Sequence, residues 1–283
     1  MAITVNDFKK MKAERRKIAV LTAYDYPTAR LVDEAGIPAI LVGDSLGMVA
    51  LGYDSTLPVT MEVMLHHIKA VARGVRQAMI IGDLPFMSYH LSTEQALQNA
   101  ARFLQEGGAH AVKLEGGVTV ADKVRRIVDC GIPVMGHIGL TPQSVHGFGG
   151  FRAQGKTLDS ARRIFDDAVA LEQAGAFSIV LETIPSELAD IISRKLSVPT
   201  IGIGAGAECD GQVQVLTDLL GFSSDKPPKH AGQYASLHEV VKRAAGEYMR
   251  DVIGSSFPTG SHCPHLEQSV LDDLDNFLKG LER

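Results

Sequence analysis

Eight short apolar runs recur along the chain, and each is closed by a glycine or a polar turn. The runs are Ile18–Ala23, Ala39–Gly43, Ala78–Gly82, Ala111–Leu114, Pro133–Gly136, Phe177–Leu181, Pro199–Ile203 and Val213–Leu216. Most of them are continuous rather than alternating, which is typical of strands buried on both faces of a parallel sheet. This repetition constrains the fold more than any other feature of the sequence.

Amphipathic helical patterns lie between the apolar runs. Thr93–Gln105 follows Ser92, a favoured N-cap residue, and is followed by a pair of glycines. The segments Asp159–Gln173, Val120–Asp129 and Ser186–Leu196 repeat the pattern. Alternating strands and helices predict a parallel α/β fold, and eight strands favour a closed (β/α)₈ TIM barrel over an open doubly wound sheet.

The two ends of the chain extend this barrel. We expect a barrel core over about residues 17–222 and an extra N-terminal helix over about residues 4–16 that covers the bottom of the barrel. A C-terminal extension over about residues 223–283 ends in an acidic amphipathic helix. No second domain is expected, so residues 1–283 are interpreted as a single TIM-barrel domain.

The composition excludes several classes of function. The chain carries 28 lysines and arginines against 33 aspartates and glutamates, a net charge of −5, whereas nucleic-acid-binding proteins are typically basic. It lacks both the apolar stretch of a membrane span and the apolar core of a signal peptide. Its three scattered cysteines predict neither disulfides nor a zinc site. We therefore expect a cytoplasmic protein with no nucleic-acid or membrane partner.

Acidic residues follow the apolar runs at the points where the strands are expected to end. Asp44 follows the second run, Asp83 the third, Glu115 the fourth and Glu182 the sixth. The carboxyl ends of all strands in a (β/α)₈ barrel form one rim, where catalytic groups lie. We therefore expect these four carboxylates to gather at one end of the barrel.

Three of these acids suit a metal ion. A carboxylate after a buried strand needs a partner, because desolvation disfavours its charge. Mg²⁺ prefers oxygen ligands and is often held by one or two carboxylates together with water and substrate. We interpret Asp44, Asp83 and Glu115 as metal ligands. The alternative is that they cap helices or pair with basic residues such as Lys113.

Other side chains at the rim suit binding and proton transfer. Lys113 lies two residues before Glu115, on the same side of the strand, where its charge suits a substrate carboxylate or an enolate. A structural ion pair is the alternative. Glu182, on the other wall, is the candidate general base. His137 is interpreted as either a substrate contact or a core histidine, and Ser45 as either a substrate contact or a helix cap.

Glycine makes up 28 of the 283 residues, and many glycines follow strands. The segment His146–Gly155, after the fifth run, is long enough to act as a lid, and its phenylalanines argue against a disordered insertion. Gly202–Gly206 lacks the spacing of a dinucleotide site. Barrels nevertheless bind polar ligands after strands seven and eight, so this loop is a second candidate for ligand contact.

Motifs at these positions resemble those of a known family, and they extend from about residue 4 to residue 225. The matching segments are Leu21–Asp25, Val42–Met48, Gly52–Thr56, Gly82–Phe86, Lys113–Gly117, Gly136–Gln143, Gly149–Phe151, Gly202–Gly206 and Cys209–Gln212. Because these strings are unusual in combination, the resemblance is specific. The chain resembles the ketopantoate hydroxymethyltransferases of pantothenate biosynthesis.

The resemblance implies a barrel of the phosphoenolpyruvate-utilising type, assembled as a homodecamer of two pentameric rings. It implies transfer of a hydroxymethyl group from 5,10-methylenetetrahydrofolate to 3-methyl-2-oxobutanoate, giving 2-dehydropantoate through an enolate stabilised by Mg²⁺. By position, Asp44 and Asp83 match the metal ligands, Glu115 matches a third ligand that acts directly or through water, and Glu182 matches the proton acceptor. The keto-acid contacts that match are Asp44, Ser45, Asp83 and Lys113, to which we add His137 from its place at the rim.

Two other functions fit parts of the pattern. A Mg²⁺-dependent carbon–carbon lyase of the isocitrate lyase and phosphoenolpyruvate mutase group would share the barrel and the acids. Those enzymes typically carry a reactive cysteine on a lid, and His146–Gly155 has none. A protein that only binds a small acid would not need a separate base such as Glu182.

Overall fold

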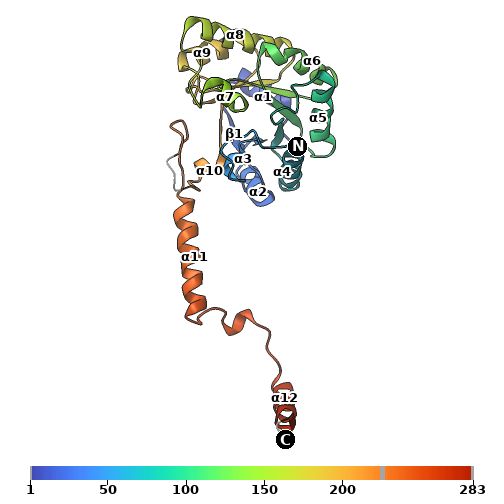
Figure 1. The fold of residues 1–283 in the computed structure, drawn as a ribbon, viewed down its shortest axis with the longest axis vertical. Helices are drawn as coiled ribbons and strands as arrows, with labels where there is room; N and C mark the ends of the chain where they lie inside the picture. The colour runs from blue at the N-terminus through green and yellow to red at the C-terminus, as the bar shows by residue number, and fades with distance from the viewer. Residues whose placement is uncertain (1, 224–226, 282–283) are drawn as a thin grey trace. The chain divides into compact units, whose positions relative to one another are not determined.

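The computed structural model describes residues 2–223 and 227–281, in which eight parallel strands close into a barrel (Figure 1). The strands are β1 (Ile18–Thr22), β2 (Ala39–Val42), β3 (Met79–Asp83), β4 (Ala111–Glu115), β5 (Val134–Gly139), β6 (Ser178–Glu182), β7 (Thr200–Ile203) and β8 (Gly211–Gln214). Each strand pairs with its neighbours in the sequence, and β8 closes the barrel by pairing with β1. The expected (β/α)₈ fold is confirmed.

Helices connect the strands around the outside of the barrel. They are α2 (Tyr26–Glu34), α3 (Leu46–Val49), α4 (Met61–Gly74), α5 (Thr93–Gln105), α6 (Ala121–Asp129), α7 (Val145–Phe148), α8 (Leu158–Gln173), α9 (Ser186–Lys195) and α10 (Leu216–Leu219), with 3₁₀ turns at Val118–Val120 and Pro142–Ser144. Helix α5 has the predicted bounds because the Ser92 side chain accepts a hydrogen bond from the Gln95 backbone N–H at its start.

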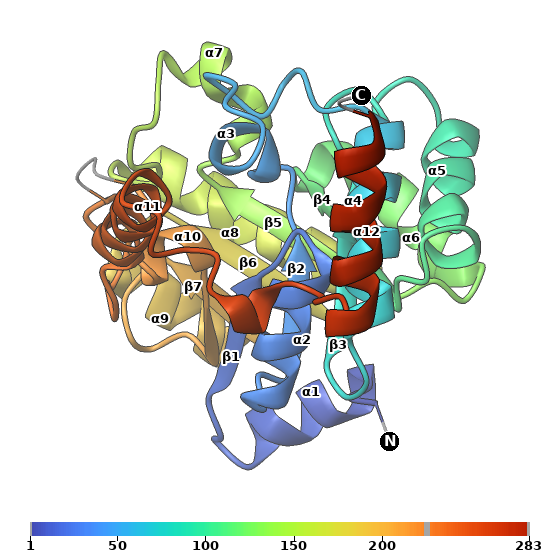
Figure 2. The same cartoon turned by 90° about the horizontal axis from the view of Figure 1, so that it is seen from below.

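The N-terminal helix α1 (Val5–Ala13) covers the end of the barrel at which the strands begin, as expected. Thr4 and Asp7 form a capping box at its start. Phe8 and Met11 are buried among the apolar side chains that fill the barrel interior, and the ring of Phe8 packs edge-on against Phe177. Figure 2 shows α1 on one side of the strands and α3 and α7 on the other.

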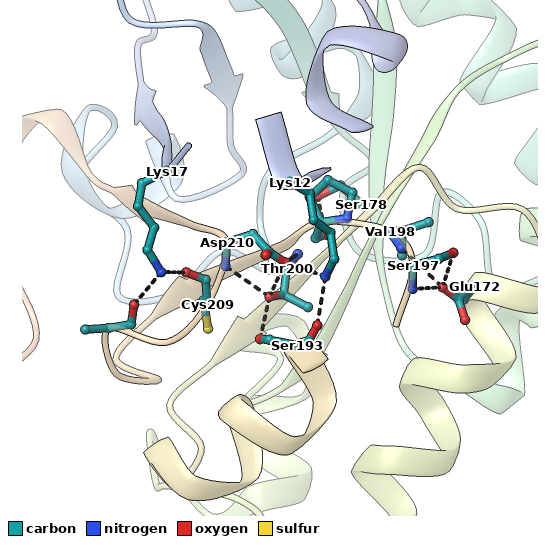
Figure 3. Close-up of polar contacts among 12 residues, drawn as sticks. Lys12, Lys17, Glu172, Ser178, Ser193, Ser197, Val198, Thr200, Cys209 and Asp210 are labelled. Atoms are coloured by element: carbon teal, nitrogen blue, oxygen red, sulfur yellow. Dashed lines mark hydrogen bonds and ion pairs between the residues drawn. The ribbon is translucent and has the colours of Figure 1, made fainter. Parts of the chain in front are cut away.

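Polar contacts tie α1 to the strands at this end of the barrel (Figure 3). Lys12 Nζ lies 2.7 Å from Asp210 Oδ2 and donates to the Ser193 carbonyl at 2.8 Å. The same Asp210 oxygen accepts hydrogen bonds from the backbone N–H and the hydroxyl of Thr200. Lys17 Nζ donates to the Cys209 carbonyl. These contacts fix the start of β7 and the turn into β8.

Strand β8 begins two residues earlier than the sequence predicts. The apolar pattern predicts a strand at Val213–Leu216, but the strand starts at Gly211, which pairs with both Ile18 and Ile201. A Cβ atom on Gly211 would lie 2.3 Å from the Ile18 carbonyl oxygen, so the close strand approach requires glycine there. The apolar pattern misplaced this strand because, besides Gly211 and two glutamines, the strand contains a single apolar residue, Val213.

The chain divides into two compact units, Met1–Tyr234 and Ala235–Arg283. The second unit contains α11 (Leu237–Ile253), a 3₁₀ turn at Gly260–His262 and α12 (Gln268–Leu281), and neither helix has a buried residue. Residues 224–226 and 282–283 of the expected C-terminal extension lie outside the described residues. Within the described chain, the helices are too short or too polar to cross a membrane.

Candidate active site

The carboxyl ends of the strands bring the expected side chains into one cavity of about 490 Å³. Asp83, Glu115 and Glu182 are the last residues of β3, β4 and β6, and Asp44 follows β2 after one glycine. The cavity is lined by all seven candidate residues: Asp44, Ser45, Asp83, Lys113, Glu115, His137 and Glu182. The parallel strands place these groups at one end of the barrel because they all run in the same direction.

The turn after β2 holds Asp44 and Ser45 close to their neighbours. The Asp44 backbone N–H donates to Asp83 Oδ2 at 3.3 Å, and the hydroxyls of Ser45 and Tyr24 lie 2.9 Å apart. A Cβ atom on Gly43 would lie 2.9 Å from Ser45 Oγ and 3.8 Å from Asp83 Oδ2. The glycine therefore lets backbone and carboxylate approach each other.

Lys113 is the ammonium group of the cluster. It pairs in register with Asp83 on the neighbouring strand, and its Nζ lies 2.7 Å from Asp83 Oδ1. Burial opposes the charge on Lys113, but the carboxylates of Asp83, Glu115 and Asp44 outweigh it and hold the pKa of Lys113 above its ordinary value. The lysine is therefore charged at neutral pH.

His137 connects Lys113 to Glu182. Its Nδ1 lies 3.2 Å from Lys113 Nζ, and its Nε2 lies 3.0 Å from Glu182 Oε2, a close contact that falls short of hydrogen-bond geometry. Burial and the charge of Lys113 lower the pKa of His137, so the imidazole is neutral at neutral pH. Because Nδ1 must accept from the ammonium group, the ring proton lies on Nε2, which faces Glu182.

Gln143, which sequence reasoning did not single out, lies at the centre of a buried hydrogen-bond network. Its side-chain amide donates to Asp44 Oδ2 at 2.8 Å and to the Leu84 carbonyl at 2.9 Å. Its backbone N–H donates to Glu115 Oε2 at 3.0 Å, and its Oε1 accepts from the Tyr89 hydroxyl at 2.7 Å. Gln143 belongs to the resembling segment Gly136–Gln143, but a glutamine in a loop carries no chemical signal by itself.

The cluster holds more negative than positive charge. Four carboxylates face one ammonium group and a neutral imidazole. Burial and the neighbouring Asp83 carboxylate raise the pKa of Asp44 to about 7, and burial raises the pKa of Glu115 well above its ordinary value although Lys113 opposes this shift. Among the described residues, Glu115 Oε1 is buried without a hydrogen-bond donor. Such a surplus suits a cation.

The arrangement fits a hard divalent ion held by two carboxylates. The Asp44 backbone contacts the Asp83 carboxylate, and both side chains line the cavity, where an ion would complete its shell with water and substrate. In the described part of the chain, no group of three or more His, Cys, Asp or Glu residues forms a metal cage. Glu115 is occupied on one oxygen by Gln143, which suits a contact through water.

The two glycine-rich loops flank the cavity. The first contains α7 and a left-handed Gly149, and its Phe151 lines the cavity. The second, Gly202–Gly206, follows β7, and its Ile203 lines the cavity beside Thr183. Ligand contact by these loops is consistent with their position at the strand ends.

The molecule is thus a (β/α)₈ barrel with a cavity lined by charged side chains at the carboxyl ends of its strands, where TIM-barrel enzymes hold their active sites. Residues 2–260 match the sequence model of the ketopantoate hydroxymethyltransferase family. A 3-methyl-2-oxobutanoate hydroxymethyltransferase from Dehalococcoides mccartyi is 64% identical over 274 residues, covering 97% of this chain and 98% of that protein. One from Clostridium novyi is 53% identical, covering 97% and 100%. The chain belongs to the ketopantoate hydroxymethyltransferase family.

Solved structures with the same fold are more distant in sequence. A phosphonopyruvate hydrolase superposes with a TM-score of 0.60 at 14% identity, covering 99% of this chain and 98% of that one. A complex of phosphonopyruvate hydrolase with oxalate and Mg²⁺ gives 0.58 at 13%, covering 99% and 98%. 2,3-Dimethylmalate lyase, a member of the PEP mutase/isocitrate lyase superfamily, gives 0.56 at 15%, covering 100% and 98%. These likenesses show the fold alone.

Proposed function

We propose that this protein transfers a hydroxymethyl group from 5,10-methylenetetrahydrofolate to 3-methyl-2-oxobutanoate, giving 2-dehydropantoate. Its family and the names of its relatives support the reaction. The structural observation that carries the proposal is the separation of roles in one cavity. Asp44 and Asp83, joined by a hydrogen bond from the Asp44 backbone, suit a metal, while Glu182 on β6 lies against His137.

Asp44 and Asp83 would hold Mg²⁺, with Glu115 acting through water. The bound ion would supply positive charge to the keto and carboxylate oxygens of the keto acid. The surplus of carboxylates and the raised pKa of Asp44 support this assignment. Gln143 then has a positioning role, since its amide holds one oxygen of Asp44 and leaves the other for a ligand.

The remaining residues perform the proton transfer and bind the substrate. Glu182 removes the proton from C3 of the keto acid, and C3 forms a bond to the one-carbon unit of the folate. The two bonds from that carbon to the folate nitrogens break, water supplies the hydroxyl oxygen, and tetrahydrofolate leaves after its nitrogens take up the C3 proton and one proton of the water. Lys113 lies where negative charge develops on the keto acid. The N–H of neutral His137 faces Glu182 and orients its carboxylate, and the Ser45 hydroxyl contacts the keto acid.

The functional unit is a single TIM-barrel domain with its extension, assembled as a homodecamer in the cytoplasm. Both helices of the second unit expose large apolar side chains, which in a stable protein are usually covered by a partner. On α11 these include Val241, Tyr248 and Ile253, and on α12 they include Leu274 and Phe277. Light scattering on the full-length protein is expected to give the mass of ten chains, and the mass of one chain would refute the assembly.

A coupled assay tests the reaction directly. The full-length protein is expected to consume methylenetetrahydrofolate only when 3-methyl-2-oxobutanoate and Mg²⁺ are both present. Excess EDTA should stop turnover, and added Mg²⁺ should restore it. Turnover without the keto acid, or cleavage of a 2-hydroxy acid without folate, would refute the proposed reaction and favour the lyase.

A further inference from the structure

The cavity is larger than the proposed keto acid requires. A volume of about 490 Å³ lies in the range of sites that enclose drug-sized ligands, whereas the keto acid is a small branched chain. The groups assigned to the keto acid and its metal lie on β2, β3, β4 and β5. The opposite side of the cavity, which follows β6, β7 and β8, is left for another ligand.

We call this opposite side the donor lobe, and its lining differs in character from the acid cluster. It combines three apolar side chains with three polar ones. Its residues are Thr183, Ile203, Val213, Val215, Asp218 and His230. Apolar walls with a few placed polar groups are typical of sites for flat heterocycles.

The glycine loop after β7 shapes the donor lobe. Gly204 has a positive φ of 64°, a backbone conformation that side chains rarely adopt. A Cβ atom there would lie 3.2 Å from His230 Cβ and 3.3 Å from Thr183 Oγ1. Glycine at this position therefore lets His230 pack against the loop, which closes the wall of the lobe.

Asp218 is the one carboxylate of the donor lobe. It is half-buried, and within residues 2–223 and 227–281 no hydrogen bond to its side chain is among the interactions that act on its charge. Burial raises the pKa of Asp218, and only the nearby His230 opposes this among the groups that act on it. A carboxylate that lines a cavity without a donor is suited to accept hydrogen bonds from a ligand.

We propose that Asp218 binds the pteridine of the folate donor by accepting hydrogen bonds from its ring N3–H and its 2-amino group. These two donors lie on one edge of the 2-amino-4-oxopyrimidine ring, and a carboxylate can accept both at once. Ile203, Val213 and Val215 would flank the ring. This assignment rests on the proposed function, because it requires a folate as the second substrate.

The test compares Asp218→Asn with Asp129→Asn, an exposed acid at the end of α6 outside the cavity. The probes are tetrahydrofolate and its analogue that lacks the 2-amino group, measured by calorimetry on full-length protein. We expect Asp218→Asn to weaken tetrahydrofolate binding by roughly 10- to 100-fold. Keto-acid affinity, which a general structural defect would also reduce, is expected to stay within about twofold.

The analogue without the 2-amino group tests whether Asp218 contacts that group. The parent protein is expected to bind the analogue more weakly than tetrahydrofolate, and Asp218→Asn to bind both with similar affinity. Asp129→Asn should behave like the parent. Equal loss of both probes and of the keto acid in Asp218→Asn, or unchanged tetrahydrofolate affinity, would refute the assignment. A parent protein that fails to bind tetrahydrofolate at all would instead refute the proposed function.

Discussion

At the amino-terminal end of the barrel the buried polar groups have partners, whereas at the carboxyl end they are out of balance. The first end pairs Lys12 with Asp210, whose carboxylate also accepts hydrogen bonds from Thr200 (Figure 3). The second end sets four carboxylates against Lys113 and a neutral His137. Lysines and acidic residues therefore form balanced pairs at one end of the barrel and an unbalanced cluster at the other.

The difference indicates where this protein gives up stability for function. A partly buried pair with several hydrogen bonds holds the fold together, but a surplus of buried like charges destabilises it unless a ligand binds. Barrels generally place stability at the end where strands begin and chemistry at the end where they finish. Substitutions at the two ends should therefore have opposite effects on stability and activity.

The largest effect is expected from Glu182→Gln. Loss of the base should slow exchange of the C3 hydrogen of the keto acid with D₂O by ~10²- to 10⁴-fold. The unfolding temperature should stay close to that of the parent, because Glu182 is at the edge of the cluster. Exchange followed by NMR provides the measurement, and Glu187→Gln in the first turn of α9 is the matched control. Exchange at the parental rate would exclude Glu182 as the base.

Lys12→Met should reduce stability rather than activity. Removing the ammonium group leaves Asp210 partly buried without its partner, so the free energy of unfolding should fall by about 2–3 kcal/mol. Activity per folded molecule should be unchanged. Urea denaturation measures the loss, and Lys10→Met, whose exposed pair with Glu14 is 3.8 Å long, should cost less than about 0.5 kcal/mol. Equal losses in the two variants would contradict the account.

Asp33 supplies a pH-dependent test at the amino-terminal end. Burial opposes its charge, but hydrogen bonds from the backbone N–H groups of Ala78, Arg76 and Gln77 outweigh this and lower the pKa of Asp33. An acid with a lowered pKa stabilises the fold above its unfolded pKa and loses this contribution as pH falls through its folded pKa. Asp33→Asn should cost about 1–2 kcal/mol at pH 7, and the difference should vanish in acid. A difference independent of pH would refute this role.

The smallest expected change in stability is a gain rather than a loss. Asp44→Asn keeps an oxygen for the Gln143 amide but removes one charge from the crowded cluster, so the metal-free protein should gain about 1 kcal/mol. Thermal unfolding in EDTA measures this gain, and activity should be lost. A loss of stability comparable to that of Lys12→Met would show that the carboxyl end is as well balanced as the other.

Sequence patterns predicted the parts of the molecule that depend on local signals. Apolar runs located most of the strands, and Ser92 located the start of α5. The acids after the strands were recognisable because a charge beside a buried strand is rare without a role. β8 was displaced because its position depends on the close approach of Gly211 to β1, which hydrophobicity does not record.

The sequence could not show contacts between distant segments. Gln143 reaches Asp44 across 99 positions, and only the closed barrel brings its loop over that carboxylate. The pairing of His137 with Glu182 and the tautomer that follows likewise depend on the spacing of two strands. Asp218 was not singled out because an aspartate in the first turn of a short helix is ordinary in sequence.

The most direct test of the charge surplus is calorimetric titration of the chelator-treated, full-length protein with Mg²⁺ in the presence of the keto acid. We expect one ion per chain in the parent and in Lys12→Met, and binding ~10- to 100-fold weaker in Gln143→Met, which loses the amide that holds Asp44. Absence of Mg²⁺ binding in the parent, or equal affinity in Gln143→Met, would contradict the account.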